Sequence, residues 1–138
     1  MNRNYRYIGC FFNRRSFFPE VAHLRNDPPS QQIRSPHVTF VYAPSEIDRS
    51  LFGRTIRVRI TGYGNDGQNE GLRVELFSDD PAIAEMIARI EVPHITLAIS
   101  ADGKAVNTKY LEFRDVEPIL LTGKFGGYTA QGRVIIRP

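Results

Sequence analysis

The stretch Pro36-His37-Val38-Thr39-Phe40 returns later in the chain as Pro93-His94-Ile95-Thr96-Leu97. Each copy reads proline, histidine, a β-branched residue, threonine and a large apolar residue. In an extended strand, side chains at positions i and i+2 point to the same face, roughly 6.5–7 Å apart. Each copy therefore predicts a strand with one apolar face for a core and one histidine/threonine face for a cleft.

Two copies of the motif together indicate a function that one copy alone does not. A single copy is consistent with a histidine that sits at a strand start, hydrogen-bonded and idle. Two such strands side by side would bring His37, Thr39, His94 and Thr96 to one pocket. One imidazole can serve as base while the other serves as acid, and the hydroxyls can hold phosphoryl oxygens. These residue types predict metal-free acid–base chemistry on a phosphate.

The chain is long enough for one domain, residues 1–138, with 41% apolar and 24% charged residues. No apolar run is long enough to span a membrane, and the first residues lack the apolar core of a signal peptide, so we expect a cytoplasmic protein. The net charge of +3 suits an anionic substrate. Cys10 is the only cysteine, so it cannot form an internal disulfide, and its apolar surroundings predict a core residue.

Periodicity and turn residues predict the order of the elements. Asp80 and Pro81 suit the start of a helix that runs to residue 90. A weaker helical pattern covers residues 16–26, with Ser16 as its cap and Pro19 in its first turn. Asp102-Gly103 is a hairpin signal. Strands are expected over residues 5–12, 37–42, 55–61, 72–77, 94–100, 118–125 and 128–136, the last two closing around Gly126-Gly127.

Each half of the chain thus contains strands, a helix and one motif strand. The simplest architecture is an α+β domain of two related, pseudo-symmetric lobes. Each lobe would have an antiparallel sheet with a helix outside, and the cleft would lie between the two motif strands.

At this point the chain resembles the 2H phosphoesterase superfamily, whose signature is a pair of His-x-Thr/Ser motifs flanked by apolar residues. The family includes LigT-like RNA 2′,3′-cyclic phosphodiesterases, tRNA-ligase-type cyclic phosphodiesterases, 2′,5′-oligoadenylate phosphodiesterases and phage enzymes that degrade cyclic oligonucleotides. The resemblance spans most of the chain, and residues 122–128 (TGKFGGY) are similar to a late strand of the tRNA-ligase-like branch.

The resemblance implies a metal-independent phosphodiesterase acting on a 2′,3′-cyclic phosphate or a related RNA or oligonucleotide linkage. His37 and His94 would be catalytic, and Thr39 and Thr96 would bind the phosphoryl group. Tyr128 is the best candidate for stacking on a base, Lys124 is a candidate phosphate partner, and no cofactor is required.

Other tyrosines lie near these positions. Tyr42 follows the first motif but would point to the face opposite His37 if the strand is regular, and it is a further candidate for substrate contact. Tyr63 lies beside a glycine and is a weaker candidate. His23 has no threonine partner and receives no role.

Two alternatives remain at this stage. The chain could be a non-catalytic nucleotide- or RNA-binding module that kept the pocket. It could also be a metallohydrolase with His37 and His94 as ligands, although the sequence shows no third ligand in a metal-binding motif. We expect a monomer that binds RNA ends or oligonucleotides and does not associate with membranes.

Overall fold

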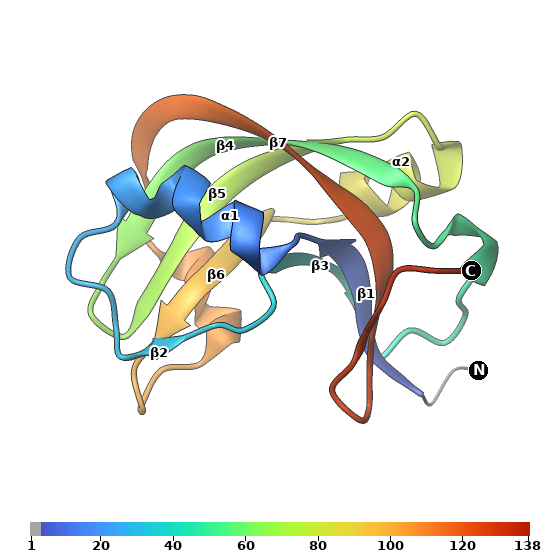
Figure 1. Ribbon diagram of the computed structural model, residues 1–138, viewed down its shortest axis with the longest axis horizontal. Coiled ribbons are helices and arrows are strands. Elements are labelled where there is room, and N and C mark those ends of the chain that lie inside the picture. The colour runs from blue at the N-terminus through green and yellow to red at the C-terminus, as the bar shows by residue number, and fades with distance from the viewer. Residues whose placement is uncertain (1–3) are drawn as a thin grey trace.

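The fold is known from a computed structural model that describes residues 4–138 (Figure 1). Among these residues, no helix is both long and apolar enough to cross a membrane. The elements are β1 (Tyr5–Phe11), α1 (Arg14–Val21), η1 (Ala22–Leu24), β2 (Gln31–Gln32), β3 (His37–Tyr42), η2 (Arg49–Leu51), β4 (Thr55–Asn65), β5 (Asn69–Phe77), α2 (Pro81–Ala88), β6 (His94–Ile99), η3 (Ala105–Tyr110), β7 (Arg114–Thr129) and β8 (Val134–Ile135), where η marks a 3₁₀ helix.

The eight strands form one sheet in the order β2-β6-β5-β4-β7-β1-β3, with β8 paired to β7. The pairings found between these strands are antiparallel. The long strand β7 pairs with β4 over its first part and with β1 over its second part, so it joins the two halves of the sheet. The predicted α+β class is confirmed, and the strands expected in two lobes belong to one continuous sheet.

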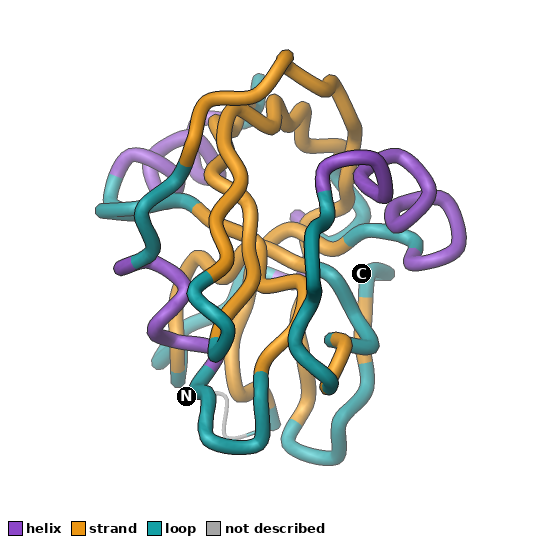
Figure 2. Tube along the Cα trace, turned by 90° about the vertical axis from the view of Figure 1, so that its left-hand side faces the viewer, coloured by secondary structure: helices purple, strands orange, loops and turns teal. Residues whose placement is uncertain are grey.

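The sheet is strongly curled, as Figure 2 shows from the side. Twist accumulates from strand to strand, and register shifts add to it locally. As a result β3, at one end of the strand order, comes to lie beside β6, near the other end (Figure 1). The two motif strands are therefore neighbours in space without being paired through the sheet.

One face of the sheet forms the core. On β4, Ile56, Val58 and Ile60 are buried and alternate with Arg57 and Arg59. The two helices add apolar side chains to the same core, which also contains Cys10. The main helical contributions are Phe17 and Val21 from α1 and Ile83 from α2.

The helix starts were predicted with mixed success. α2 begins as expected, because the Asp80 carboxylate accepts hydrogen bonds from the N–H groups of Ala82 and Ile83. The predicted start of α1 was wrong. Asn13, and not Ser16, caps this helix, accepting from the N–H groups of Arg15 and Ser16, so Pro19 lies inside the helix.

The expected closing pair of strands was also wrong. β7 runs straight through Gly126-Gly127, and the chain reverses later, where Gly132 adopts a φ of 83°. A side chain at Gly126 would overlap the carbonyl of Ile135, and one at Gly127 would overlap the ring of Tyr5. These glycines permit close packing within a strand and do not mark a turn.

The Asp102-Gly103 signal did not produce a hairpin either. The chain that leaves β6 turns at these residues and enters the short helix η3 instead of a returning strand. η3 packs against β5 and β6, next to the second motif. These residues therefore predict a turn correctly, but the element that follows the turn depends on tertiary packing.

Candidate functional site

The two motif strands have the same pairing geometry. β3 pairs with β1, where Thr39 lies opposite Gly9, and β6 pairs with β5, where Thr96 lies opposite Gly71. Directly after each threonine the register shifts by one residue, and the extra residue is the fifth of the motif in both copies. The repeat in sequence is thus a repeat in three-dimensional structure.

The register shift leaves the apolar face of each motif turned inward. Val38, Ile95 and Leu97 are almost fully buried, and Phe40 packs against the same core. This confirms the predicted apolar face of both motif strands. The histidines and threonines occupy the other face.

The glycines opposite the threonines are required by close backbone contact. A Cβ atom at Gly9 would overlap the carbonyl oxygen of Val38. One at Gly71 would overlap the methyl group of Thr108 and also the corresponding carbonyl of Ile95. In each copy this carbonyl belongs to the residue between the histidine and the threonine. Glycine therefore allows the partner strand to lie close to each motif.

The motif prolines are also held alike. The carbonyl of Pro36 accepts a hydrogen bond from the N–H of Phe12 at 3.1 Å, and that of Pro93 accepts from Val74 at 3.1 Å. In each copy the donor comes directly after the residue that pairs with the histidine. Phe12 follows Phe11, the partner of His37, and Val74 follows Arg73, the partner of His94.

The two imidazoles are oriented by equivalent hydrogen bonds. Nδ1 of His37 lies 2.8 Å from the carbonyl oxygen of Ser35, and Nδ1 of His94 lies 2.7 Å from that of Val92. A carbonyl oxygen only accepts, so Nδ1 carries the proton in both bonds. In a neutral imidazole this leaves the lone pair on Nε2, which is the atom free to take up or return a proton.

Aromatic rings surround His37. Tyr7 stacks on the imidazole with 4.6 Å between ring centroids, and Phe11 lies at 5.7 Å. Tyr128 stacks on Tyr7 at 5.0 Å, so the rings continue from β3 across β1 to β7. Tyr42 meets the edge of this group 5.9 Å from Tyr7 and is 61% exposed. This aromatic cluster presents open ring surface beside a histidine.

β3 is not a regular strand before it reaches Tyr42. In a regular strand Tyr42 would point away from the face of His37, but the extra residue Phe40 reverses the alternation. Tyr42 is therefore paired with Tyr7, just as His37 is paired with Phe11, and all four side chains share one face. Tyr63, by contrast, is buried and donates a hydrogen bond to the core carboxylate of Glu70.

Burial and neighbouring charge lower the pKa of both histidines. For His37 the main cause is loss of solvent, with a smaller contribution from the charge of the neighbouring His94. For His94 the main cause is also burial, and the ammonium of Lys109 in η3 adds to it. In both cases the backbone carbonyl acts in the opposite direction. The lowered pKa of each histidine favours its neutral form.

The two threonines differ in their surroundings. Thr96 is only 8% exposed, and its hydroxyl lies 2.7 Å from that of Thr108 and 3.2 Å from the carbonyl of Ala105. The Asn69 amide donates to the Thr108 hydroxyl, which leaves the Thr108 proton for Thr96 and the Thr96 proton for Ala105. The single hydroxyl proton of Thr96 is therefore already donated within the protein. Thr39 is half-buried, and no hydrogen bond of its hydroxyl is found within residues 4–138.

Lys124 and Tyr128 lie on the aromatic side of β7. Register places Lys124 opposite Phe11 and Tyr128 opposite Tyr7. The side chain of Lys124 is exposed, and its ammonium donates a hydrogen bond to the hydroxyl of Thr55 on β4. β4 pairs with β7 on the side away from β1. Tyr128 thus joins the aromatic cluster, and Lys124 lies one strand further from His37 than Phe11 does.

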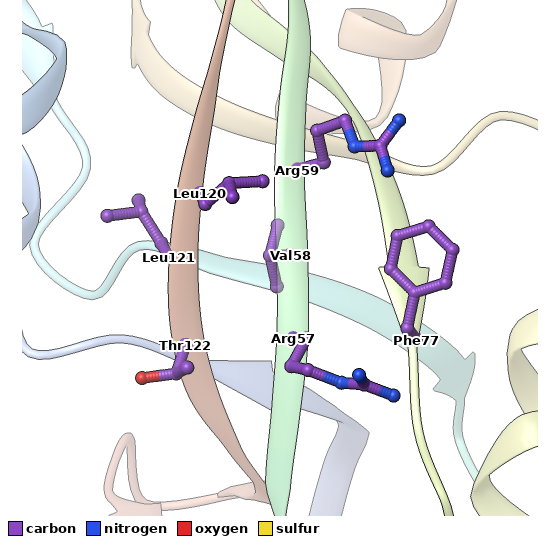
Figure 3. Close-up of a pocket in the computed structure, with 7 residues that line it drawn as sticks. All are labelled: Arg57, Val58, Arg59, Phe77, Leu120, Leu121 and Thr122. Carbon is purple, nitrogen blue, oxygen red and sulfur yellow. The ribbon is translucent and has the colours of Figure 1, made fainter.

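A separate hollow of about 580 Å³ lies on β4, β5 and β7 (Figure 3). Figure 3 shows Arg57 and Arg59 extending from β4 toward the side on which Phe77 lies. Arg59 lies over the Phe77 ring and forms an ion pair with Glu75, and Arg57 pairs with Asp79. Its arginines already have carboxylate partners, and the residues that line it include no histidine. This hollow offers no acid–base pair.

Within residues 4–138, no three histidine, cysteine, aspartate or glutamate side chains gather closely enough to hold a metal ion.

No protein-family model matches the chain, and no curated protein matches it significantly. The residues of the site itself are therefore the basis for assigning a function. Sequence reasoning missed several of its residues, which carry no motif and come together only through strand pairing and packing: Tyr7, Gly9, Phe11, Gly71, Thr108 and Lys109.

Proposed function

We propose that this protein is a metal-independent phosphodiesterase that hydrolyses a 2′,3′-cyclic phosphate or a related RNA or oligonucleotide linkage. The observation that supports it best is the matched placement of His37 and His94. Each is fixed through Nδ1 to a backbone carbonyl two residues earlier, with Nε2 free, on strands that lie side by side. Two positioned imidazoles of this kind are what acid–base hydrolysis requires.

In the proposed reaction, one Nε2 removes a proton from water as the water oxygen bonds to phosphorus. The bond from phosphorus to one ribose oxygen breaks, and the protonated Nε2 of the other histidine donates its proton to that oxygen. Which histidine acts as base depends on which ester oxygen leaves. The site would lie between two lobes of the curled sheet, one built around β3 and the other around β6.

The lowered pKa values are compatible with this mechanism. They favour the neutral form of both imidazoles in the free protein, yet the histidine that acts as acid must carry a second ring proton on Nε2. An anionic phosphodiester bound between them favours the protonated form of a neighbouring imidazole. Substrate binding would thus recruit the catalytic proton.

The threonines and the aromatic cluster would hold the rest of the substrate. The Thr39 hydroxyl is the better donor to a phosphoryl oxygen, because that of Thr96 is already used within the protein. The ring surface of Tyr7, Tyr42 and Tyr128 suits a nucleobase, since stacking needs no particular base sequence.

The decisive experiment is a panel of phosphodiesters incubated with the protein in excess EDTA. The panel contains 2′,3′-cyclic nucleotides, RNA with a terminal cyclic phosphate, 2′,5′-oligoadenylates and cyclic oligonucleotides, with products resolved as 2′- or 3′-phosphates. His37→Ala and His94→Ala should abolish most of the turnover, whereas the exposed His23→Ala should not.

Two outcomes would contradict the proposal. Turnover that is equal in all three histidine variants would remove the imidazoles from the mechanism. Nucleotide binding at the aromatic cluster without turnover of any member of the panel would instead support a non-catalytic binding module.

A further inference from the structure

The second motif is anchored to a short helix, and the first motif has no equivalent contact among the described residues. Thr108 of η3 is completely buried, and its hydroxyl is bonded to Thr96 on β6 and to the Asn69 amide on β5. The same amide also donates to the carbonyl of Lys104 at 2.7 Å, where η3 begins. Both ends of the helix are therefore tied to the sheet beside His94.

The next residue, Lys109, is placed by this anchor. Its side chain is half-buried, and its ammonium lies 5.1 Å from the centroid of the Tyr110 ring. No carboxylate forms an ion pair with it within residues 4–138. A lysine held partly out of solvent without an anionic partner is suited to bind an anion from solution.

Lys109 differs from the other charged groups around His94 in its ion pairing. On β5, Arg73 is paired in register with His94, but it forms an ion pair with Asp115. β3, which carries His37, and η3, which carries Lys109, both pack against β6. Among the described residues, Lys109 is the cation of this group without a carboxylate partner. It follows Thr108, whose hydroxyl lies 2.7 Å from that of Thr96, two residues after His94.

We propose that Lys109 binds the phosphoryl anion on the His94 side of the site, and that Thr96 acts through Thr108 to position this lysine. The two motifs would then contribute differently. On the β3 side a hydroxyl, Thr39, contacts the phosphate, whereas on the β6 side the threonine anchors η3 and the ammonium supplies the contact. This inference deepens the proposed function and rests on it for the identity of the substrate.

The test compares Lys109→Gln with Lys104→Gln and Lys109→Arg. Lys104 is a matched control, since it lies at the start of the same helix with an exposed side chain, and its carbonyl still accepts from Asn69 after substitution. The probe is inorganic phosphate, titrated while the imidazole C–H signals of His37 and His94 are followed by NMR. The same spectra report whether each variant is folded.

We expect Lys109→Gln to weaken phosphate binding about ten- to a hundredfold, the usual effect of losing one charge-assisted hydrogen bond. The midpoint of the His94 titration should rise in the free Lys109→Gln variant, because a nearby positive charge has been removed. Lys104→Gln should leave both properties unchanged, and Lys109→Arg should restore binding. A purely structural role for Lys109 would not produce this pattern.

Failure of this inference can be told apart from failure of the proposed function. If the wild-type protein hydrolyses no phosphodiester but Lys109→Gln alone loses phosphate binding, the inference stands and the catalytic proposal falls. If turnover needs both histidines but Lys109→Gln and Lys104→Gln behave alike, the inference is overturned. Absence of phosphate binding by the wild-type protein at millimolar concentration would overturn it as well.

Discussion

The different hydrogen bonding of the two motif threonines leads to a prediction that separates stability from activity. The perturbation is replacement of each by valine, which keeps the branched shape and removes the hydroxyl. Thr96 is buried, and its hydroxyl accepts from Thr108 and donates to the carbonyl of Ala105. Thr39 is half-buried, with no such bonds found in the described residues. The same substitution should therefore have different consequences at the two positions.

The expected magnitudes follow from these contacts. Removing one partner of a buried hydrogen bond costs about 1–3 kcal/mol, so Thr96→Val should lower the free energy of unfolding by that amount. Thr39→Val should change it by less than about 0.5 kcal/mol. If Thr39 donates to a phosphoryl anion, its loss costs about 1.5–3 kcal/mol of binding in the transition state, a drop of about 10- to 150-fold in kcat/KM.

Stability is measured by urea denaturation followed by circular dichroism. With an m-value of about 2 kcal/mol/M, the midpoint of Thr96→Val should fall by about 0.5–1.5 M. Activity is measured on the best substrate of the panel, under conditions in which each variant is folded. Thr39→Ser and Thr96→Ser retain the hydroxyl and serve as controls at both positions.

Two results would refute the reasoning. A Thr39→Val protein as destabilised as Thr96→Val would mean that the Thr39 hydroxyl has an important partner in the folded protein. A Thr96→Val protein of unchanged stability whose kcat/KM falls further than that of Thr39→Val would mean that Thr96 itself contacts the substrate.

Further predictions concern the histidines, the pH dependence and the strand contacts. His37→Ala and His94→Ala should each lower turnover by about 10²–10⁴, and the double variant should lose less than the product of the two, as steady-state kinetics will show. Since burial lowers both pKa values, the bell-shaped profile of kcat/KM should have its maximum below the ordinary histidine value of about 6.5, and a maximum at higher pH would contradict this. For the same reason, stability measured in urea should fall as the pH drops from about 6.5 through the lowered pKa values, because the unfolded chain binds protons more readily. Gly9→Ala and Gly71→Ala should each destabilise by about 1–3 kcal/mol, since the added methyl group meets a backbone carbonyl and, at Gly71, also the Thr108 methyl group; melting temperatures equal to wild type would argue against these close contacts.

Much of the local architecture could be predicted from the sequence because it depends on short-range patterns. Alternation identified the buried face of both motif strands, and Asp80 with Pro81 identified the start of α2. A few consecutive residues determine which side chains share a face of a strand. They also determine whether a side chain at a helix start can accept hydrogen bonds from the first backbone N–H groups. The candidate histidines and threonines are likewise identified by a pattern of five consecutive residues that occurs twice.

The errors arose where distant segments decide local structure. Gly126-Gly127 resembles a turn, yet it lies within a strand because Ile135 and Tyr5 leave no room for side chains there. Tyr42 changed face because β3 carries one residue more than its partner strand at this point. Neither the partner strand nor the register shift can be read from the residues concerned.

The sequence by itself therefore determined which side chains each motif presents, because the two-residue period of a strand is local. Only the tertiary structure decided their neighbours. Curling of the sheet brought β3 and β6 together, pairing with β1 placed Tyr7 over His37, and packing of η3 engaged the hydroxyl of Thr96 but not that of Thr39. The physical reason is that strand order, register and helix packing depend on contacts between segments far apart in the chain, and two nearly identical motifs can acquire different surroundings through them.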